Sequence, residues 1–185
     1  MDKKEAIFKA ALDLIAENGF HNSPMSVLAK RANVAAGTIY HYFSSKEELI
    51  AELYSYLKHK VSEKNLPEDD TSKSFKERFK KLFFGFYQYF LNNSKEFVFL
   101  EQFNNSVFLG KNKDEIIKID QIYIEFLRKG VVTSNLRDMP TKLHLALFNA
   151  QISAIVKLSL RNELLMDDTN INAAFNSCWE GLRKN

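Results

Sequence analysis

One short stretch, residues 34–46, carries side chains suited to contact with another molecule. Ile39 and Phe43 stand four residues apart, so on a helix they would share one inward face. The residues left for the outward face offer small groups, hydroxyls and ring edges: Ala36, Gly37, Thr38, Tyr40, His41 and Tyr42. A short helix with such a surface suits a groove of double-stranded DNA, where side chains meet base edges.

The rest of the sequence contains no arrangement of residues that is typical of a catalytic site. No Ser, His and acid arrangement lies in a nucleophile elbow, and the sequence has no glycine-rich phosphate loop. The single cysteine, Cys178, excludes an internal disulfide and a multi-cysteine metal site, and no second ligand stands at metal-binding spacing beside His41. We therefore expect no enzymatic activity, no cofactor and no metal.

The elements before this stretch must hold it in place. Ser23 and Pro24 are a good N-cap and first helical residue for a helix at about residues 24–32. Asn33 tolerates the left-handed conformation, so it predicts a tight turn into the next helix. Apolar residues at steps of three and four predict a first helix over residues 3–18, ended by Gly19. The three helices would form a small bundle.

Residues 7–53 resemble the N-terminal domain of TetR-type transcriptional regulators. The family pattern contains Gly and an aromatic residue, then Ile-Ala, Gly-Val, Gly-Thr-Leu-Tyr-x-x-Phe and Lys-Glu-x-Leu. The corresponding motifs here are Gly19-Phe20, Leu28-Ala29, Asn33-Val34, Gly37-Thr38-Ile39-Tyr40-His41-Tyr42-Phe43 and Lys46-Glu47-Glu48-Leu49. Asn33 replaces the usual Gly, and Ala35 replaces the usual Ser cap, so the third helix should begin without a side-chain cap.

The resemblance implies a sequence-specific transcriptional regulator that binds double-stranded operator DNA through the third helix. Thr38 and Tyr40 would touch phosphates, whereas Ala36 and His41 would face the bases. Tyr40 and Tyr42 could instead be core residues, because aromatic side chains on helices often are. The full set of candidate DNA-binding residues is Lys30, Ala36, Gly37, Thr38, Tyr40, His41, Tyr42 and Lys46. Few of these are strong base readers, so thymine methyl contacts and indirect readout should contribute to specificity.

Charge supports a DNA partner only weakly. The net charge is +3, and residues 1–64 contain nine Lys or Arg against eight Asp or Glu. Charges must therefore be well placed, because they are not abundant. The candidates for phosphate contact are Lys30, Lys46, Lys58 and Lys60, and the alternative for each is a solvated surface position.

Few Gly and Pro and no strict polar–apolar alternation predict an all-α protein. Ser45 and Glu48 form a capping box for a connecting helix that runs to about Lys64, and the acidic segment at residues 66–72 breaks it. We predict an N-terminal three-helix, helix-turn-helix DNA-binding domain and a C-terminal helical ligand-binding and dimerisation domain. The predicted boundaries are 1–45 for the DNA-binding domain, 46–66 for the connecting helix and 73–185 for the effector-binding and dimerisation domain.

Eleven of the sixteen Phe lie between Phe75 and Phe126. They predict helices at about residues 75–90, 95–107 and 113–129, the last one ending at Gly130. Such rings either form a packed core or line a small-molecule site, which the resemblance places here. The candidate effector-binding residues are Phe83, Phe86, Tyr87, Glu101, Phe103, Tyr123, Phe126 and Asn149. An inward Glu101 would favour a lipophilic cationic effector, and an outward Glu101 would remove that argument.

The last two expected helices, one opened by Pro140 and one at about residues 170–183, suggest an interface. The first carries a stripe of small residues beside larger apolar ones: Ala146, Ala150, Ser153 and Ala154, with Leu143, Leu147, Ile155 and Leu158. TetR-like proteins dimerise through their last two helices, so a two-fold axis would make a four-helix bundle here. A core within one chain is the alternative.

These observations predict a homodimeric repressor that an unknown small-molecule effector releases from its operator. Two alternatives stay open: a DNA-binding regulator controlled by a partner protein, and a helical interaction module whose head no longer binds DNA. The sequence has no N-terminal signal and no run of about eighteen apolar residues, so we expect a cytoplasmic protein with no membrane partner.

Overall fold

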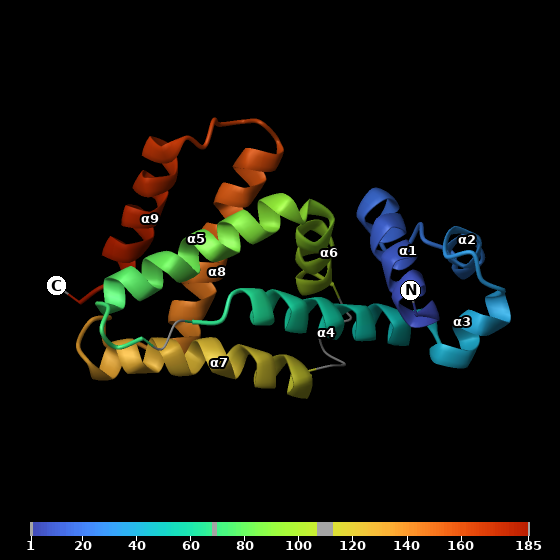
Figure 1. The fold of residues 1–185 in the computed structure, drawn as a ribbon, viewed down its shortest axis with the longest axis horizontal. Helices are drawn as coiled ribbons and strands as arrows, with labels where there is room; N and C mark the ends of the chain where they lie inside the picture. The colour runs from blue at the N-terminus through green and yellow to red at the C-terminus, as the bar shows by residue number, and fades with distance from the viewer. Residues whose placement is uncertain (1, 68–69, 107–112, 185) are drawn as a thin grey trace. The chain divides into compact units, whose positions relative to one another are not determined.

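The computed structural model describes residues 2–67, 70–106 and 113–184, and of residues 113–117 only the backbone. These described residues form nine α-helices and no β-strand, which confirms the predicted all-α class (Figure 1). In chain order the helices are α1 (Lys3–Asn18), α2 (Met25–Arg31), α3 (Ala36–Tyr42), α4 (Lys46–Lys64), α5 (Phe75–Asn92), α6 (Ser94–Asn104), α7 (Lys113–Val132), α8 (Thr141–Leu160) and α9 (Asp168–Leu182). The expected helix end at residue 107 and the turn at 110–112 lie outside the described residues.

The chain divides into two compact units. The first contains residues 1–60 and 93–116, and the second contains residues 61–92 and 117–185. The first unit therefore holds α6 as well as the three N-terminal helices. The boundaries predicted at residues 45 and 73 concern a division of function and stay a prediction.

Within the first unit, α1 is the helix against which the others pack. It contacts α2 and α6, and α2 contacts α3. Its buried face is the predicted one, and Phe20, just beyond the helix, meets the edge of Phe99 from α6 at 5.6 Å between ring centroids. The predicted three-helix bundle is thus completed by a fourth helix that comes from much later in the sequence.

The start of α2 differs from the prediction. Pro24 is the N-cap residue, with extended backbone angles, and the first helical residue is Met25. Ser23 does not cap this helix, because its hydroxyl donates to the carbonyl oxygen of Gly19 at 2.7 Å. The Ser23 side chain therefore fixes the turn after α1 instead of the beginning of α2.

The capping box at α4 is partly as predicted. The backbone N–H of Glu48 donates to Ser45 Oγ at 3.1 Å. The Glu48 carboxylate, however, returns to Ser44, accepting from its N–H and its hydroxyl, each at 2.5 Å. These hydrogen bonds lower the pKa of Glu48, because they favour the charged carboxylate.

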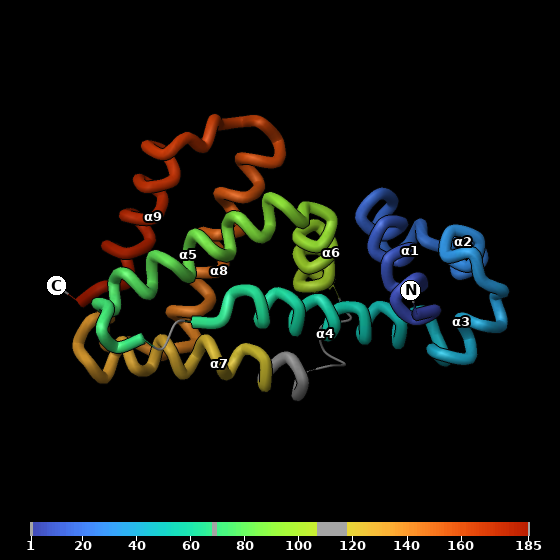
Figure 2. Tube along the Cα trace, in the orientation of Figure 1, coloured from blue at the N-terminus to red at the C-terminus, as the bar shows by residue number. Residues whose placement is uncertain are grey.

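Aromatic side chains from four helices form the core of the second unit. Helix α8 packs against α5 and α9, and α5 also contacts α9 (Figure 2). Phe79 of α5 lies 5.5 Å from Phe148 of α8 and 5.6 Å from Trp179 of α9, between ring centroids. Phe75 stacks on Phe126 of α7 at 4.8 Å. Burial of these large rings supplies much of the driving force for folding this unit.

The prediction that Gly130 ends α7 is wrong, because the helix continues to Val132. Gly130 is buried, and a Cβ atom placed on it would overlap the Phe75 ring and lie 2.8 Å from Leu136 Cδ1. The chain turns only at Ser134, which has a φ of 58°. Glycine at position 130 therefore serves close packing against two core side chains.

We expect Gly130→Ala to lower the free energy of unfolding by about 1–3 kcal/mol, because the added methyl group would displace Phe75 or Leu136. This loss would exceed the gain of about 1 kcal/mol in helix propensity. Gly181→Ala is the matched control, since its Cβ would meet nothing within 4 Å. Urea unfolding followed by circular dichroism would measure both, and equal stabilisation of the two variants would contradict the packing role.

Candidate DNA interface and effector region

The turn between α2 and α3 is built as the sequence predicts. Asn33 adopts the left-handed conformation with a φ of 53°, and the Val34 N–H donates to the Ala29 carbonyl oxygen at 3.0 Å. Ala35 precedes α3 in extended geometry and makes no side-chain cap. The two helices are therefore joined by a short turn that depends on backbone hydrogen bonds.

Two buried side chains hold α3 against the rest of the first unit. Ile39 and Phe43 are almost fully buried, as predicted from their spacing. The Phe43 ring lies 5.6 Å from Phe8 of α1, and the Lys4 ammonium lies over both rings. The inner face of α3 is thus fixed to α1, which sets the direction of its outer face.

The outer face of α3 presents the candidate DNA-binding residues to solvent. Tyr40 is 55% exposed and Tyr42 is 36% exposed, so neither side chain fills the core. Ala36, Gly37 and His41 are exposed, and Thr38 is half-buried. A Cβ on Gly37 would meet nothing within 4 Å, so packing does not require glycine there. Open space around this backbone would let a DNA strand approach closely.

The four lysines proposed to contact phosphate differ in their exposure and in the bonds they already make within the chain. Lys30 is exposed at the end of α2. Lys46 donates from its ammonium group to the carbonyl oxygen of Phe20, so it joins the start of α4 to the turn after α1. Lys60 pairs with the buried Glu96 of α6 at 2.5 Å, and Lys58 is half-buried. Lys30 is accordingly the candidate best placed to reach a phosphate in this geometry.

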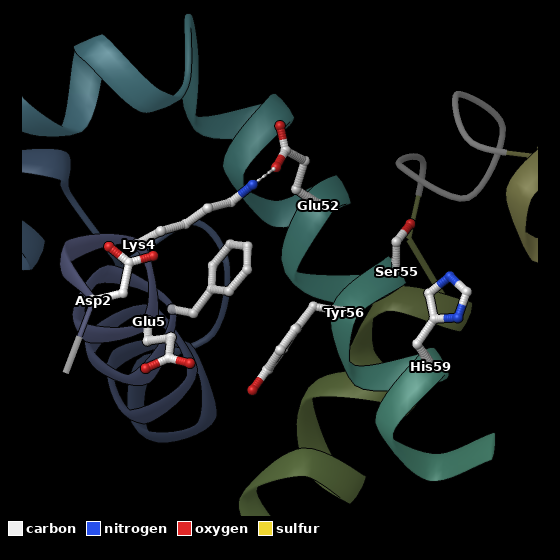
Figure 3. A pocket seen from close by; sticks show the side chains of 8 residues that line it. Asp2, Lys4, Glu5, Glu52, Ser55, Tyr56 and His59 are labelled. Atoms are coloured by element: carbon white, nitrogen blue, oxygen red, sulfur yellow. Dashed lines mark ion pairs between the residues drawn. The ribbon is translucent and has the colours of Figure 1, made fainter. Parts of the chain in front are cut away.

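A hollow of about 460 Å³ lies between the start of α1 and the middle of α4 (Figure 3). Lys4 crosses it to pair with Glu52 at 2.7 Å, and the Phe8 and Tyr56 rings lie 5.2 Å apart. The Tyr56 side chain is 44% exposed at this hollow. The residues that line the hollow are Asp2, Lys4, Glu5, Phe8, Glu52, Ser55, Tyr56 and His59. Three carboxylates make this surface unsuitable for phosphate, so we do not include it in the DNA interface.

Five of the candidate effector residues belong to the aromatic core of the second unit: Phe83, Phe86, Tyr87, Tyr123 and Phe126. The Phe86 ring lies 5.4 Å from Tyr123 and 5.6 Å from Phe148. The Tyr87 hydroxyl is hydrogen-bonded to Ser159 at 3.0 Å. Phe86 and Tyr123 contact each other directly, and Phe83 and Phe86 both meet Phe148, which is also what a packed core requires.

The other three candidate effector residues lie elsewhere. Phe103 belongs to the first unit, where it stacks on Tyr54 with the ring centroids 3.9 Å apart. Glu101 also belongs to the first unit and is half-buried. Asn149 is exposed on α8. The structure therefore does not gather all eight residues around the second unit's rings.

His144 of α8 is a candidate that the sequence analysis did not identify. Its side chain is fully buried, and neither ring nitrogen has a hydrogen-bond partner among the described residues. Burial lowers the pKa of His144, against the opposing effect of the Pro140 backbone, so the ring is neutral at pH 7. The Tyr123 hydroxyl is likewise buried, and none of the described residues meets it in hydrogen-bond geometry. Burial raises the pKa of Tyr123 to about 12, although the Ser62 hydroxyl close to it opposes the shift. Periodicity could have placed His144 on the buried face, one turn before Phe148.

His144 should make the stability of the protein depend on pH. Its pKa is lowered in the folded state, so below about pH 6.5 the unfolded chain binds a proton that folded His144 does not. The free energy of unfolding should therefore fall as the pH drops from 7.5 to 5.5, by at most about 1.4 kcal/mol per pH unit from this one group. The His144→Phe variant should show a shallower dependence in urea unfolding. Identical pH profiles for the two proteins would show that His144 titrates normally.

Helix α8 exposes an apolar face within the single chain. Leu143 and Leu147 are 46% and 40% exposed, and Ala146, Ala150 and Ala154 are exposed beside them. By length and composition alone, α8 could also cross a membrane, although it contains no continuous apolar run and the same test admits helices of soluble proteins. Of the other residues predicted for this interface, Ser153 and Leu158 are half-buried and Ile155 is buried within the chain, so the interface stays a prediction.

Two family models together match almost the whole chain. Residues 7–53 match the bacterial regulatory proteins of the tetR family. Residues 47–184, well over half of the chain, match the tetracyclin repressor-like C-terminal domain. The chain belongs to the TetR family. This TetR-family protein is therefore a DNA-binding transcriptional regulator, and the resemblance in its N-terminal motifs is confirmed.

Sequence matches to individual relatives cover only segments of the chain. The protein is 52% identical over 48 residues to a fatty acid metabolism regulator protein of Bacillus subtilis (26% of this chain, 25% of that one). It is 34% identical over 105 residues to an HTH-type transcriptional regulator of Haemophilus influenzae, which covers 56% of each chain. The chain thus spans a quarter to about half of these relatives' length. A tetR family transcription regulator from Shewanella sp. PV-4 has the same fold along all of both chains, with a TM-score of 0.90 and 23% identity.

Proposed function

We propose that this TetR-family regulator is a cytoplasmic, homodimeric repressor that a small lipophilic or aromatic effector releases from its operator. The observation that carries the DNA-binding half of this proposal is the outer face of α3. Exposed Tyr40, His41 and Tyr42 stand on a helix whose inner face is anchored by Ile39 and Phe43. Because the helix is held in a fixed orientation, its exposed side chains are presented in one direction, which favours readout of base edges and phosphates.

The exposed stripe on α8 supports a homodimer. A second copy would bury Leu143, Leu147 and the neighbouring alanines, and α9 runs antiparallel beside α8 (Figure 2). Two such helix pairs would make a four-helix bundle around a two-fold axis. Dimerisation would supply two recognition helices for successive major grooves, which lie about 34–36 Å apart.

Effector control would act as a shift between two conformations of the dimer. The effector would bind among the aromatic side chains of the second unit and favour the conformation whose heads do not fit the operator. Helix α4 belongs to both units, with residues 46–60 in the first and 61–64 in the second, so it is the element through which such a change would reach the head.

Control by a partner protein is the second candidate. The direct ring contacts of Phe83 and Phe86 with Phe148 favour it, because a filled aromatic core needs no ligand. Under this alternative the DNA-binding head would keep its role, and a protein surface would replace the effector.

The test is binding of the purified protein to DNA from just upstream of its own gene, beside scrambled DNA of equal length, across a salt series. A preference for the upstream DNA that persists at high salt would support a specific regulator. Equal binding with a steep salt dependence would reveal phosphate attraction alone. Absence of binding to either DNA would contradict the proposal and favour the interaction module.

A further inference from the structure

Tyr123 and His144 are buried polar side chains that lack a hydrogen-bond partner among the described residues of the second unit. Tyr123 comes from α7 and is 5% exposed, and His144 comes from α8 and is fully buried. The Arg78 Nε atom also has no partner, but Arg78 is only half-buried and its guanidinium lies over Phe75 and Phe126. Native proteins pair the great majority of buried polar groups, so two buried exceptions in one small unit call for an explanation.

The two side chains border the same aromatic wall. Phe86 of α5 contacts the Tyr123 ring on one side and the Phe148 ring on the other, with centroid distances of 5.4 and 5.6 Å. His144 precedes Phe148 by one helical turn, so it shares the buried face of α8. Helices α5, α7 and α8 thus contribute Phe86, Tyr123 and Phe148 to one ring cluster, and His144 lies on the buried face of α8 one turn before Phe148.

The same region offers little buried charge. Among the described residues of the second unit, no Asp, Glu, Lys or Arg residue is buried as a whole, and Arg78, whose Nε atom is buried, lies over Phe75 and Phe126. Asp120, whose charge acts on Tyr123, is half-buried. An ionised ligand beside Tyr123 and His144 would therefore lose its hydration without gaining a fully buried counter-ion, which is strongly unfavourable in an apolar site. A neutral imidazole, by contrast, offers one donor and one acceptor, and the tyrosine hydroxyl offers both.

We infer that Tyr123 and His144 are the polar anchors of the effector site and that the effector is an uncharged lipophile bearing a hydroxyl or carbonyl group. The inference deepens the proposed function and rests on it. It also replaces the expectation of a cationic effector, which depended on Glu101, a half-buried residue of the first unit.

Three probes of nearly equal shape separate the ligand classes. Biphenyl-4-methanol is neutral, biphenyl-4-methylamine is a cation and biphenyl-4-carboxylate is an anion at pH 7.5. Each would be titrated into the full-length protein, with binding followed by calorimetry and by the shift in melting temperature. The neutral probe should bind at least tenfold more tightly than either charged probe.

Single substitutions then test the anchors. Tyr123→Phe and His144→Phe each remove hydrogen-bonding capacity while keeping a ring, so each should weaken the neutral probe roughly tenfold. Without ligand the same variants should melt at the same or a higher temperature than the wild type, because an unpaired buried polar group is lost. Tyr87→Phe is the matched control: its hydroxyl already pairs with Ser159, so it should lower the melting temperature and leave probe affinity unchanged.

The outcomes distinguish the inference from the proposed function. Equal binding of the neutral probe to wild type, Tyr123→Phe and His144→Phe would overturn the anchors while a lipophile site remained. Tighter binding of a charged probe would overturn the ligand class and leave effector control intact. No binding of any probe would overturn the inference, and retained upstream-DNA binding in that protein would show that the DNA-binding function survives. Lower melting temperatures for both anchor variants would show that the two groups are paired within the protein.

Discussion

Phe43→Ala is expected to abolish operator binding by destabilising the head of the protein. Phe43 is fully buried against Phe8 at the end of α3, so truncation would leave a cavity that costs about 3–5 kcal/mol. A small head has little stability in reserve, and α3 would lose its fixed orientation. Urea unfolding and mobility-shift binding to upstream DNA would measure the two effects.

Tyr40→Ala is the control for this prediction. Tyr40 also carries an aromatic ring on α3, but more than half of its surface is exposed. We expect operator affinity to fall roughly tenfold from a lost phosphate contact, while urea stability and the dimer stay unchanged. Loss of stability or of the dimer in Tyr40→Ala would show that Tyr40 is a core residue, and full operator binding by Phe43→Ala would show that α3 is held by other contacts.

Ala150→Arg is expected to convert the protein to a monomer and to weaken operator binding by about 10²–10⁴-fold. Ala150 is exposed on α8 beside Leu147, so an arginine there leaves the folded chain intact. In a close helix pair it would separate the two copies, and the second head would no longer bind as an intramolecular partner. Analytical ultracentrifugation and mobility-shift titration would measure oligomeric state and affinity.

Gln88→Arg provides the matched control, since it adds the same charge at an exposed position of α5. It should leave both the dimer and operator affinity close to the wild-type values. If Ala150→Arg stayed dimeric, the two copies would associate through another surface, and α8 would need a different explanation for its exposed leucines.

Local sequence patterns were sufficient to predict the helices and the candidate DNA-binding helix. Bounds such as residues 3–18 for α1 and the left-handed Asn33 followed from periodicity and turn chemistry, which act over a few neighbouring residues. The spacing of Ile39 and Phe43 defined the inner face of α3 for the same reason. Local rules also explain why the hydrogen bond from the Glu48 N–H to Ser45 was predicted correctly. The prediction missed that the Glu48 carboxylate accepts from Ser44.

Which distant residues meet depends on the folded chain and could not be predicted from local patterns. Gly130 resembles a helix stop in the sequence, but its need for glycine comes from Phe75 and Leu136, which lie on other segments. The grouping of α6 with the head, and so of Glu101 and Phe103, depends on contacts with α1. The unpaired state of His144 likewise depends on the helices that pack against α8, among them α5 and α9. Burial and pairing are sums over long-range neighbours, which a local pattern does not contain.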